Sequence, residues 1–251
     1  MMIIKSDSDI RLMRKAGAIA GGALRAAGEA IEAGMTTKEL DKIVESYIRS
    51  KGAIPSFKGY GGFPASACIS VNNVVIHGIP SEKVILKDGD IVSVDVGAYI
   101  GGFHGDTANT FSVGNVSPEA MKLIEVTRAS LEEAMKLLKG GVRLGDIGSC
   151  IETYVQQFGY SPVKDFVGHG IGRALHEDPN IPNFGRAGHG LRLPKGATVA
   201  IEPMINEGTD RVIVSNEDGW TVTTADGKLS AHYEHTFFID ETCGHILTLP
   251  D

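Results

Sequence analysis

The sequence predicts an α+β fold made of two similar halves, each a pair of helices followed by strands. Three observations predict it: helical segments with clear ends, apolar segments that alternate with polar residues, and an internal repeat. In the repeat, residues 30–52 align with 137–159 and residues 86–95 align with 193–202, both at an offset of 107. Seven of the 33 aligned positions are identical, so a chance match of two common strand patterns stays open. The constant offset favours a true repeat with a pseudo-two-fold axis.

Capping residues mark where four helices begin. Ser6 precedes a long segment rich in Ala, Leu and Ile, and Thr36 forms a capping-box pattern with Glu39. Pro118 suits the first position of a third helix, because that position needs no backbone N–H donor. Glycines follow the segments and mark where they end. We expect helices over about residues 9–33, 37–52, 118–139 and 145–158.

Two acidic residues, Asp95 and Asp106, lie in a segment that predicts a β-hairpin. Valines alternate with polar residues before the turn, and the glycine-rich run "GGFHG" (101–105) suits a tight turn. If the turn closes between Ile100 and Gly101, the two aspartates are directly opposed, with Cβ atoms about 5 Å apart. Like charges in that position destabilise a hairpin, so we expect a divalent cation between them.

Composition excludes several classes of protein. The 251 residues are 42% hydrophobic and 22% charged, as in soluble globular proteins. We expect one catalytic domain over residues 1–251, with halves at about 9–110 and 117–240. The net charge of −7 argues against nucleic acid as the main partner, and no apolar run is long enough to span a membrane. Three widely spaced cysteines and the absence of a secretory signal at the start indicate a reduced, cytoplasmic compartment.

Four carboxylates interrupt otherwise apolar strand sequence. Asp95 and Asp106 are joined by Glu202 in "TVAIEPM" and by Glu234 in "HYEHTFFI". One such acid alone is best explained by a solvent-facing position, but four together indicate paired or metal-bound acids. His169, in "GHGIGRALHEDP", is a candidate imidazole ligand. This mostly oxygen donor set favours Mn²⁺, Fe²⁺ or Co²⁺ and accepts Zn²⁺.

Two more histidines are candidates for substrate contact. His176 follows His169 by seven residues, and it is either a second ligand or a proton donor to the substrate. His77, in "VVIHGIP", follows apolar residues of an expected strand, where a single histidine is more often structural. The remaining histidines give no clear signal individually.

Five segments, taken together and in order, resemble the methionine aminopeptidases: "HGIP" (77–80), "DVGAYIGGFHGDTANTF" (95–111), "GHGIGRALHEDP" (168–179), "IEPM" (201–204) and "YEHT" (233–236). The resemblance runs from about residue 5 to the C-terminus. It implies the pita-bread fold of the creatinase/aminopeptidase class, in which helices cover a central antiparallel sheet. The short span between Glu202 and Glu234 leaves no room for the long insertion of type II members, so the bacterial type I form is implied.

The resemblance also implies a metal site and an activity. Two divalent ions (Co, Mn, Fe or Zn) would be held with Asp95 on one ion, His169 and Glu202 on the other, and Asp106 and Glu234 shared by both. The activity implied is removal of the N-terminal initiator methionine from peptides and nascent chains, with preference for a small second residue.

In the implied mechanism, a hydroxide shared by the two ions attacks the scissile carbonyl. Glu202 would handle protons, and His77 and His176 would steady the tetrahedral intermediate and the peptide. Nothing in the sequence demands more than a monomer, and docking on the ribosome is left open.

A pocket for an unbranched thioether needs apolar, polarisable walls. Two positions depart from the pattern of many bacterial members: Phe57 stands where they have cysteine, and Leu175 stands where they have phenylalanine. Both departures concern the size of the pocket rather than a metal ligand. The resemblance assigns the walls to Tyr60, Phe63, Cys68 and Trp220, with His77 at the rim.

Three alternative functions remain open. A proline-specific aminopeptidase or dipeptidase of the same fold usually carries a large N-terminal domain, for which this chain has no room. A metal-free peptide-binding relative would have lost ligands, whereas all five are present here. A dinuclear hydrolase of phosphate esters is disfavoured because no basic cluster flanks the acids.

Overall fold

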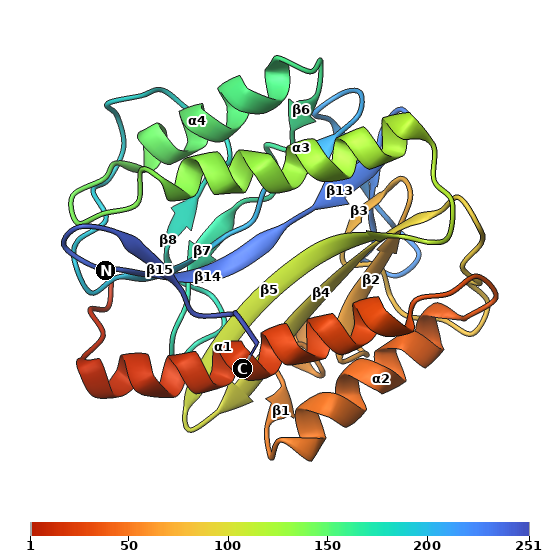
Figure 1. Cartoon of the computed structure of the whole chain (residues 1–251), viewed down its shortest axis with the longest axis horizontal. Coiled ribbons are helices and arrows are strands. Elements are labelled where there is room, and N and C mark those ends of the chain that lie inside the picture. The colour runs from red at the N-terminus through yellow and green to blue at the C-terminus, as the bar shows by residue number, and fades with distance from the viewer. Residues whose placement is uncertain (1, 251) are drawn as a thin grey trace.

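Within residues 2–250, which the computed structural model describes, the chain forms four α-helices at the expected places (Figure 1). The side chain of Ser6 accepts a hydrogen bond from the Asp9 amide, and Thr36 forms the predicted capping box with Glu39. The first and third helices end earlier than expected, because Ile31 is already extended and the chain after Met135 turns before Gly140. The helices are α1 (Asp7–Ala30), α2 (Thr37–Ser50), α3 (Pro118–Met135) and α4 (Leu144–Gln156).

A central antiparallel sheet runs through both halves and confirms the α+β fold. Among the described residues it has nine strands in the order β1-β4-β5-β14-β9-β7-β8, with β2 added beside β4 and β15 beside β14. Its strands are β1 (Ile54–Pro55), β2 (Ala67–Val71), β4 (Ile91–Ile100), β5 (Phe103–Ser112), β7 (Gly168–Gly170), β8 (Glu177–Ile181), β9 (Thr198–Ile201), β14 (Glu234–Ile239) and β15 (Gly244–Ile246).

Two small antiparallel sheets and a 3-10 turn complete the fold. One sheet has the order β13-β10-β6 and the other the order β11-β12-β3. Their strands are β3 (Val74–Ile76), β6 (Ser161–Pro162), β10 (Met204–Asn206), β11 (Val212–Val214), β12 (Val222–Thr224) and β13 (Ser230–His232), and the turn η1 is Tyr60–Gly62. None of the described helices has both the length and the apolar character that crossing a membrane needs.

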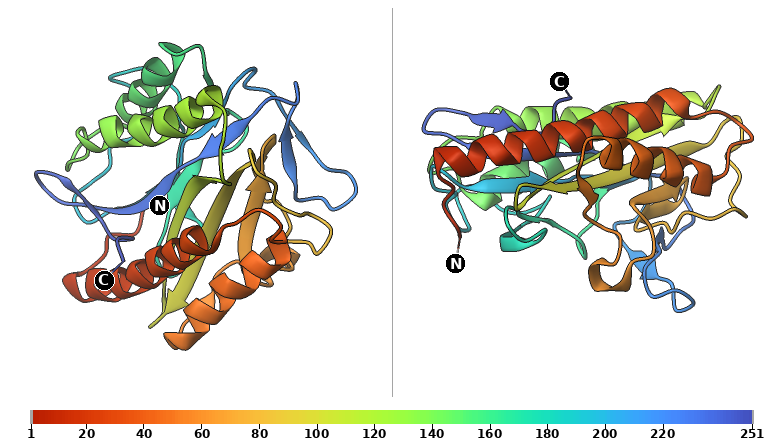
Figure 2. Two further views of the ribbon diagram at one scale, coloured as in Figure 1. Left: turned by 45° about the vertical axis from the view of Figure 1, so that its right-hand side comes forward. Right: turned by 90° about the horizontal axis from the view of Figure 1, so that it is seen from below.

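The helices cover one face of the central sheet, and loops together with the β11–β12 hairpin lie on the other side (Figure 2). In the right-hand panel of Figure 2, α1 runs along one side of the sheet and the β11–β12 hairpin projects from the opposite side. Val94 and Val96 lie in the apolar core beneath α1 and α2. Because side chains alternate along a strand, Asp95 between them faces away from the helices.

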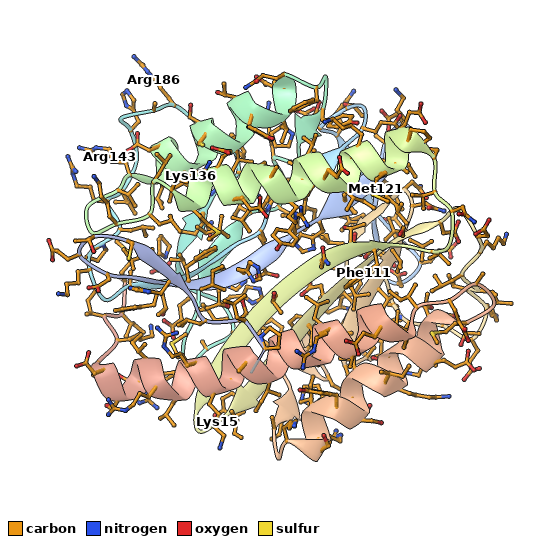
Figure 3. All side chains as sticks on the ribbon, viewed as in Figure 1. Lys15, Phe111, Met121, Lys136, Arg143 and Arg186 are labelled. Carbon is orange, nitrogen blue, oxygen red and sulfur yellow. The ribbon has the colours of Figure 1, made fainter. Side chains whose placement is uncertain are left out.

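Each helix pair packs on its own apolar core. Leu40 and Val94 belong to the core under α1 and α2, and Leu123 and Val199 belong to the core under α3 and α4. Figure 3 shows Phe111 on β5 close to α1, where Gly28 leaves room for the ring because it has no side chain. The covered face of the sheet is therefore filled, and open space is left on the opposite face.

The offset of 107 residues recurs in the backbone hydrogen bonds. The Gly34 amide donates to the Leu86 carbonyl at 2.8 Å. The equivalent bond in the second half joins Gly141 to Leu193 at 2.7 Å. The pairing of β1 with β4 is likewise repeated by β6 with β10 at the same offset. The two halves therefore share one local architecture, as the repeat predicts.

The predicted register of the β4–β5 hairpin is wrong by two residues. Asp106 lies opposite Gly97, and Asp95 lies opposite Ala108. The reason is the turn, which consists of Gly101 and Gly102. Both adopt positive φ, at 62° and 86°, a conformation that glycine reaches without steric cost. Asp95 and Asp106 are thus diagonal neighbours on one face rather than directly opposed residues.

Candidate active site

Neighbouring strands of the central sheet bring the predicted acidic residues together. Asp95 comes from β4, Asp106 from β5 and Glu234 from β14, while Glu202 directly follows β9. His169 lies on β7, which pairs with β9. All five side chains line one cavity of about 140 Å³. The structure therefore gathers the whole predicted ligand set, although its members are up to 139 positions apart in sequence.

Three of these residues are close enough to share one ion. Among the described residues, ligand atoms of Asp106, His169 and Glu234 lie within 4.8 Å of one another. The Nε2 atom of His169 is 3.6 Å from Glu202 Oε1 and 3.9 Å from Asp106 Oδ2. The His169 Nδ1 atom lies 2.9 Å from the Gly170 carbonyl, to which it can only donate. Nε2 is then the free lone pair that faces the carboxylates.

Ionisation of the carboxylates would place negative charge in the cavity that the protein itself does not compensate. Burial, followed by mutual repulsion, raises the pKa values of Asp95 and Glu234 well above their usual range, and Glu202 shifts the same way. Burial raises the pKa of Asp106 to about 7. One oxygen each of Asp95, Asp106 and Glu234 is buried without a hydrogen-bond partner. A bound cation would satisfy these unpaired oxygens, so the residues fit a divalent metal.

The histidines of the pocket are neutral. Burial lowers the pKa of His169 to about 3, so its short distances to carboxylates are not ion pairs. Burial likewise lowers the pKa of His77 to about 4 and lowers that of His176. Neutral imidazoles can ligate a metal or donate a hydrogen bond without adding positive charge.

The predicted substrate-binding residues line the same cavity. The Tyr60 hydroxyl lies 2.7 Å from His176 Nδ1, which directs the other ring nitrogen away from Tyr60. Phe63 meets Trp220 edge to face at 5.3 Å between ring centroids, and His77 meets Trp220 at 6.0 Å. The further wall residues are Phe57, Cys68 and Leu175.

Two of these wall residues have unusual local features. His77 adopts a φ of 57°, a left-handed conformation that costs free energy for a residue with a side chain. Burial and the nearby Asp95 raise the pKa of the Cys68 thiol well above its usual range, so the thiol stays protonated. Cys68 thus contributes a weakly polar wall rather than a charged group.

Sequence reasoning missed His232. Its side chain is 1% exposed, and its Nε2 lies 3.6 Å from Glu202 Oε2. Burial lowers its pKa to about 3. His232 precedes Glu234 by two positions in a strand-like segment, so the period of two puts both residues on one face. This alternation is the sequence pattern that could have indicated a position for His232 near the acidic residues.

A buried ion pair fixes the loop that carries His176. Lys5 Nζ lies 2.6 Å from Glu177 Oε2, and the two side chains are 3% and 6% exposed. The other oxygen of Glu177 accepts a hydrogen bond from the Arg173 amide at 2.8 Å. Gly172 is required here, because a Cβ would meet both charged side chains. The N-terminal segment thus ties down the residues that precede His176.

Comparison with known proteins gives matches along nearly the whole chain. The family model of metallopeptidase family M24 matches residues 11–241. A methionine aminopeptidase of Clostridium perfringens is 55% identical over 249 residues, with 99% of each chain covered. Methionine aminopeptidase 1 of Bacillus subtilis is 49% identical over 248 residues, with the same coverage.

A solved structure agrees with these matches. The crystal structure of methionine aminopeptidase from Thermotoga maritima matches with a TM-score of 0.97 and 46% identity. The match covers 99% of this chain and 100% of that chain. The similarity therefore includes both halves and the segments that line the cavity.

Replacement of Lys5 should expose the cost of an unpaired buried charge. We expect Lys5→Met to lower the free energy of unfolding by about 3–5 kcal/mol, because Glu177 loses its partner. Lys42→Met is the matched control: its ion pair with Glu82 is exposed, so the change should stay within about 0.5 kcal/mol. Urea denaturation measures both variants. Equal stabilities would contradict the structural importance of the Lys5 pair.

Asp106 should make the stability of the metal-free protein depend on pH. A group whose pKa is higher in the folded protein stabilises the fold through its protonated form. That stabilisation is complete below the unfolded-state pKa of about 4, and it is lost as the pH rises through the folded-state pKa of about 7. Asp106→Asn removes this titration. In the presence of a chelator, the variant should therefore gain a few kcal/mol on the unmodified protein between pH 4 and 8. Urea denaturation at pH 4 and at pH 8 measures the free energies of unfolding of both proteins. If their difference is the same at both pH values, the pKa of Asp106 is not shifted by folding.

Proposed function

The chain belongs to the methionine aminopeptidases of metallopeptidase family M24, and from this premise we propose how its cavity works. It is a metalloaminopeptidase that hydrolyses the peptide bond after an N-terminal methionine, and this chemistry uses a divalent metal. One observation carries the proposal: four carboxylates, three of them with a buried oxygen that has no partner, converge with a neutral histidine in a single cavity that has apolar walls.

The proposed metal site holds two divalent ions. Asp95, Asp106, His169, Glu202 and Glu234 would hold them. Charge supports the number two, because four carboxylates and a neutral imidazole balance two dications. Bound ions supply a Lewis acid for the scissile carbonyl and acidify the water that acts as nucleophile. The oxygen-rich donor set is compatible with Mn, Fe, Co or Zn.

Three residues of the chain would handle protons and developing charge. Glu202 would carry the proton: its carboxylate would accept a proton from the attacking water and return it to the leaving amine. His77 and His176 are neutral, and each can donate one N–H to the substrate or to the oxyanion that forms. The hydrogen bond from Tyr60 fixes the ring of His176 for that task.

Substrate selection would follow from the walls of the cavity. Phe63 and Trp220 form an edge-to-face pair, which suits a flexible thioether. Tyr60 is 44% exposed and lies at the rim, where the chain beyond the first residue would leave the cavity. Phe57 and Leu175 are buried in the wall, so their sizes set the space for the side chain. We propose that the second residue of the substrate is small.

We also propose the domain organisation, the oligomeric state and the compartment of the protein. The sheet passes through both halves, which supports a single catalytic domain over residues 1–251. We propose a monomer that acts in the cytoplasm on peptides and nascent chains.

A peptide assay tests the function. The purified protein should release methionine from Met-Ala-X peptides and leave X-Pro-Y peptides intact. Chelation should abolish release, and added Mn²⁺ or Co²⁺ should restore it. Cleavage of X-Pro-Y instead would indicate a proline-specific relative. Peptide binding without metal content or chelator sensitivity would indicate a binding protein.

His176→Ala separates a substrate contact from a ligand. We expect kcat to fall about 100- to 1,000-fold, because a donor to the developing oxyanion is lost, with metal content unchanged. His189→Ala is the control, since His189 lies in an exposed loop outside the cavity and should leave kcat unaltered. Steady-state kinetics with metal analysis measures both variants. Loss of metal from the His176 variant would make this residue a ligand instead.

A further inference from the structure

We propose that His232 is a positioning residue that donates its Nε2–H to Glu202 and holds that carboxylate in its metal-binding orientation. This inference rests on the ligand role proposed above for Glu202. His232 is not one of the five proposed ligands, and it does not line the cavity. It would act only through Glu202.

Two imidazoles bracket the carboxylate of Glu202. His169 Nε2 lies 3.6 Å from Oε1, and His232 Nε2 lies 3.6 Å from Oε2. His169 presents a lone pair, because its other nitrogen donates to the Gly170 carbonyl. The two oxygens of Glu202 therefore meet different partners: one lies beside the candidate metal ligands, and the other lies beside His232.

The His232 Nε2 atom has no other use in the described structure. It is fully buried and lacks a hydrogen-bond partner, a costly state for a polar atom. A carboxylate oxygen can only accept once it is ionised, so the stable arrangement places the single imidazole proton on Nε2. An approach of about 0.5 Å would bring the pair into hydrogen-bond range. This small step gives the buried Nε2–H its acceptor.

The backbone around the pair is already fixed. The His232 amide donates to Thr110 Oγ1 at 2.9 Å, and the Thr110 hydroxyl donates to the His232 carbonyl at 2.9 Å. The Asn183 side-chain amide donates to the Glu202 carbonyl at 2.9 Å. Only the carboxylate itself lacks a donor, and His232 is placed to supply it. Hydrogen bonds to metal-binding carboxylates typically raise metal affinity by 10- to 100-fold.

A partly buried histidine on β14, the strand that follows β13 in the chain, offers a contrast. His235 Nδ1 lies 2.8 Å from Thr248 Oγ1, and His235 Nε2 lies 3.2 Å from the Tyr233 hydroxyl. Both ring nitrogens are therefore engaged in the protein, and neither faces the carboxylates. His235 serves as the control for the loss of a partly buried imidazole.

Metal titration of the full chain tests the proposal. Affinity for Mn²⁺, measured by calorimetry, should fall about 10- to 100-fold in His232→Leu, which keeps bulk but has no donor. His232→Gln keeps an N–H donor and should restore most of the affinity. His235→Leu should lower thermal stability and leave Mn²⁺ affinity unchanged. Unchanged affinity in His232→Leu, or equal losses in the Leu and Gln variants, would overturn the proposal.

Two further measurements keep the outcome clear. Glu202→Gln in the same titration tests the underlying ligand role: unchanged affinity there removes the premise, whereas a loss there without a loss in His232→Leu rejects only the role of His232. If the His232 variants do not fold, ¹⁵N NMR of the unmodified Zn²⁺-loaded protein decides. A proton on Nε2 supports the proposal, and a proton on Nδ1 rejects it.

Discussion

The repulsion among four carboxylates in one cavity is the constraint on which the rest of the structure depends. Each acid alone would raise the cost of folding, because burial disfavours its charged form, and three of the four acids bury one oxygen without a hydrogen-bond partner. Within the part of the chain that the structure describes, no lysine or arginine lines the cavity. Divalent cations remain as the compensation that fits the donor set. Function and stability thus rest on the same charges: the ions that neutralise the site also supply its chemistry.

The duplicated architecture explains how such a site is assembled. The first half contributes Asp95 and Asp106 from one hairpin, and the second half contributes His169, Glu202 and Glu234 from three strand regions. These strands are neighbours in a single sheet, so the rigid ladder fixes the relative positions of the ligands. The helices lie on the opposite face of the sheet from Asp95 (Figure 2). Neutral histidines and aromatic side chains then surround the acids without adding charge that would compete with a metal.

The sequence predicted much of this because the chemistry lies in patterns of short range. Acids in apolar strand sequence, capping residues and the repeat offset are visible without a structure. The hairpin register was predicted wrongly because the sequence does not show which two residues form the turn. In the structure Gly101 and Gly102 form it, both with positive φ. His232 was missed because its significance comes from Glu202, which lies 30 positions earlier in the sequence, shortly before the strand β10 that pairs with β13. The Lys5–Glu177 pair joins residues 172 positions apart, which no local pattern reveals.

We propose that cations inside the cavity hold the acidic residues together. Anomalous scattering from crystals of the Mn²⁺-loaded protein tests this most directly, because it locates the ions independently of activity. We expect two strong peaks among Asp95, Asp106, His169, Glu202 and Glu234. Full loading with peaks only elsewhere on the molecule, and the carboxylates paired by shared protons, would contradict it.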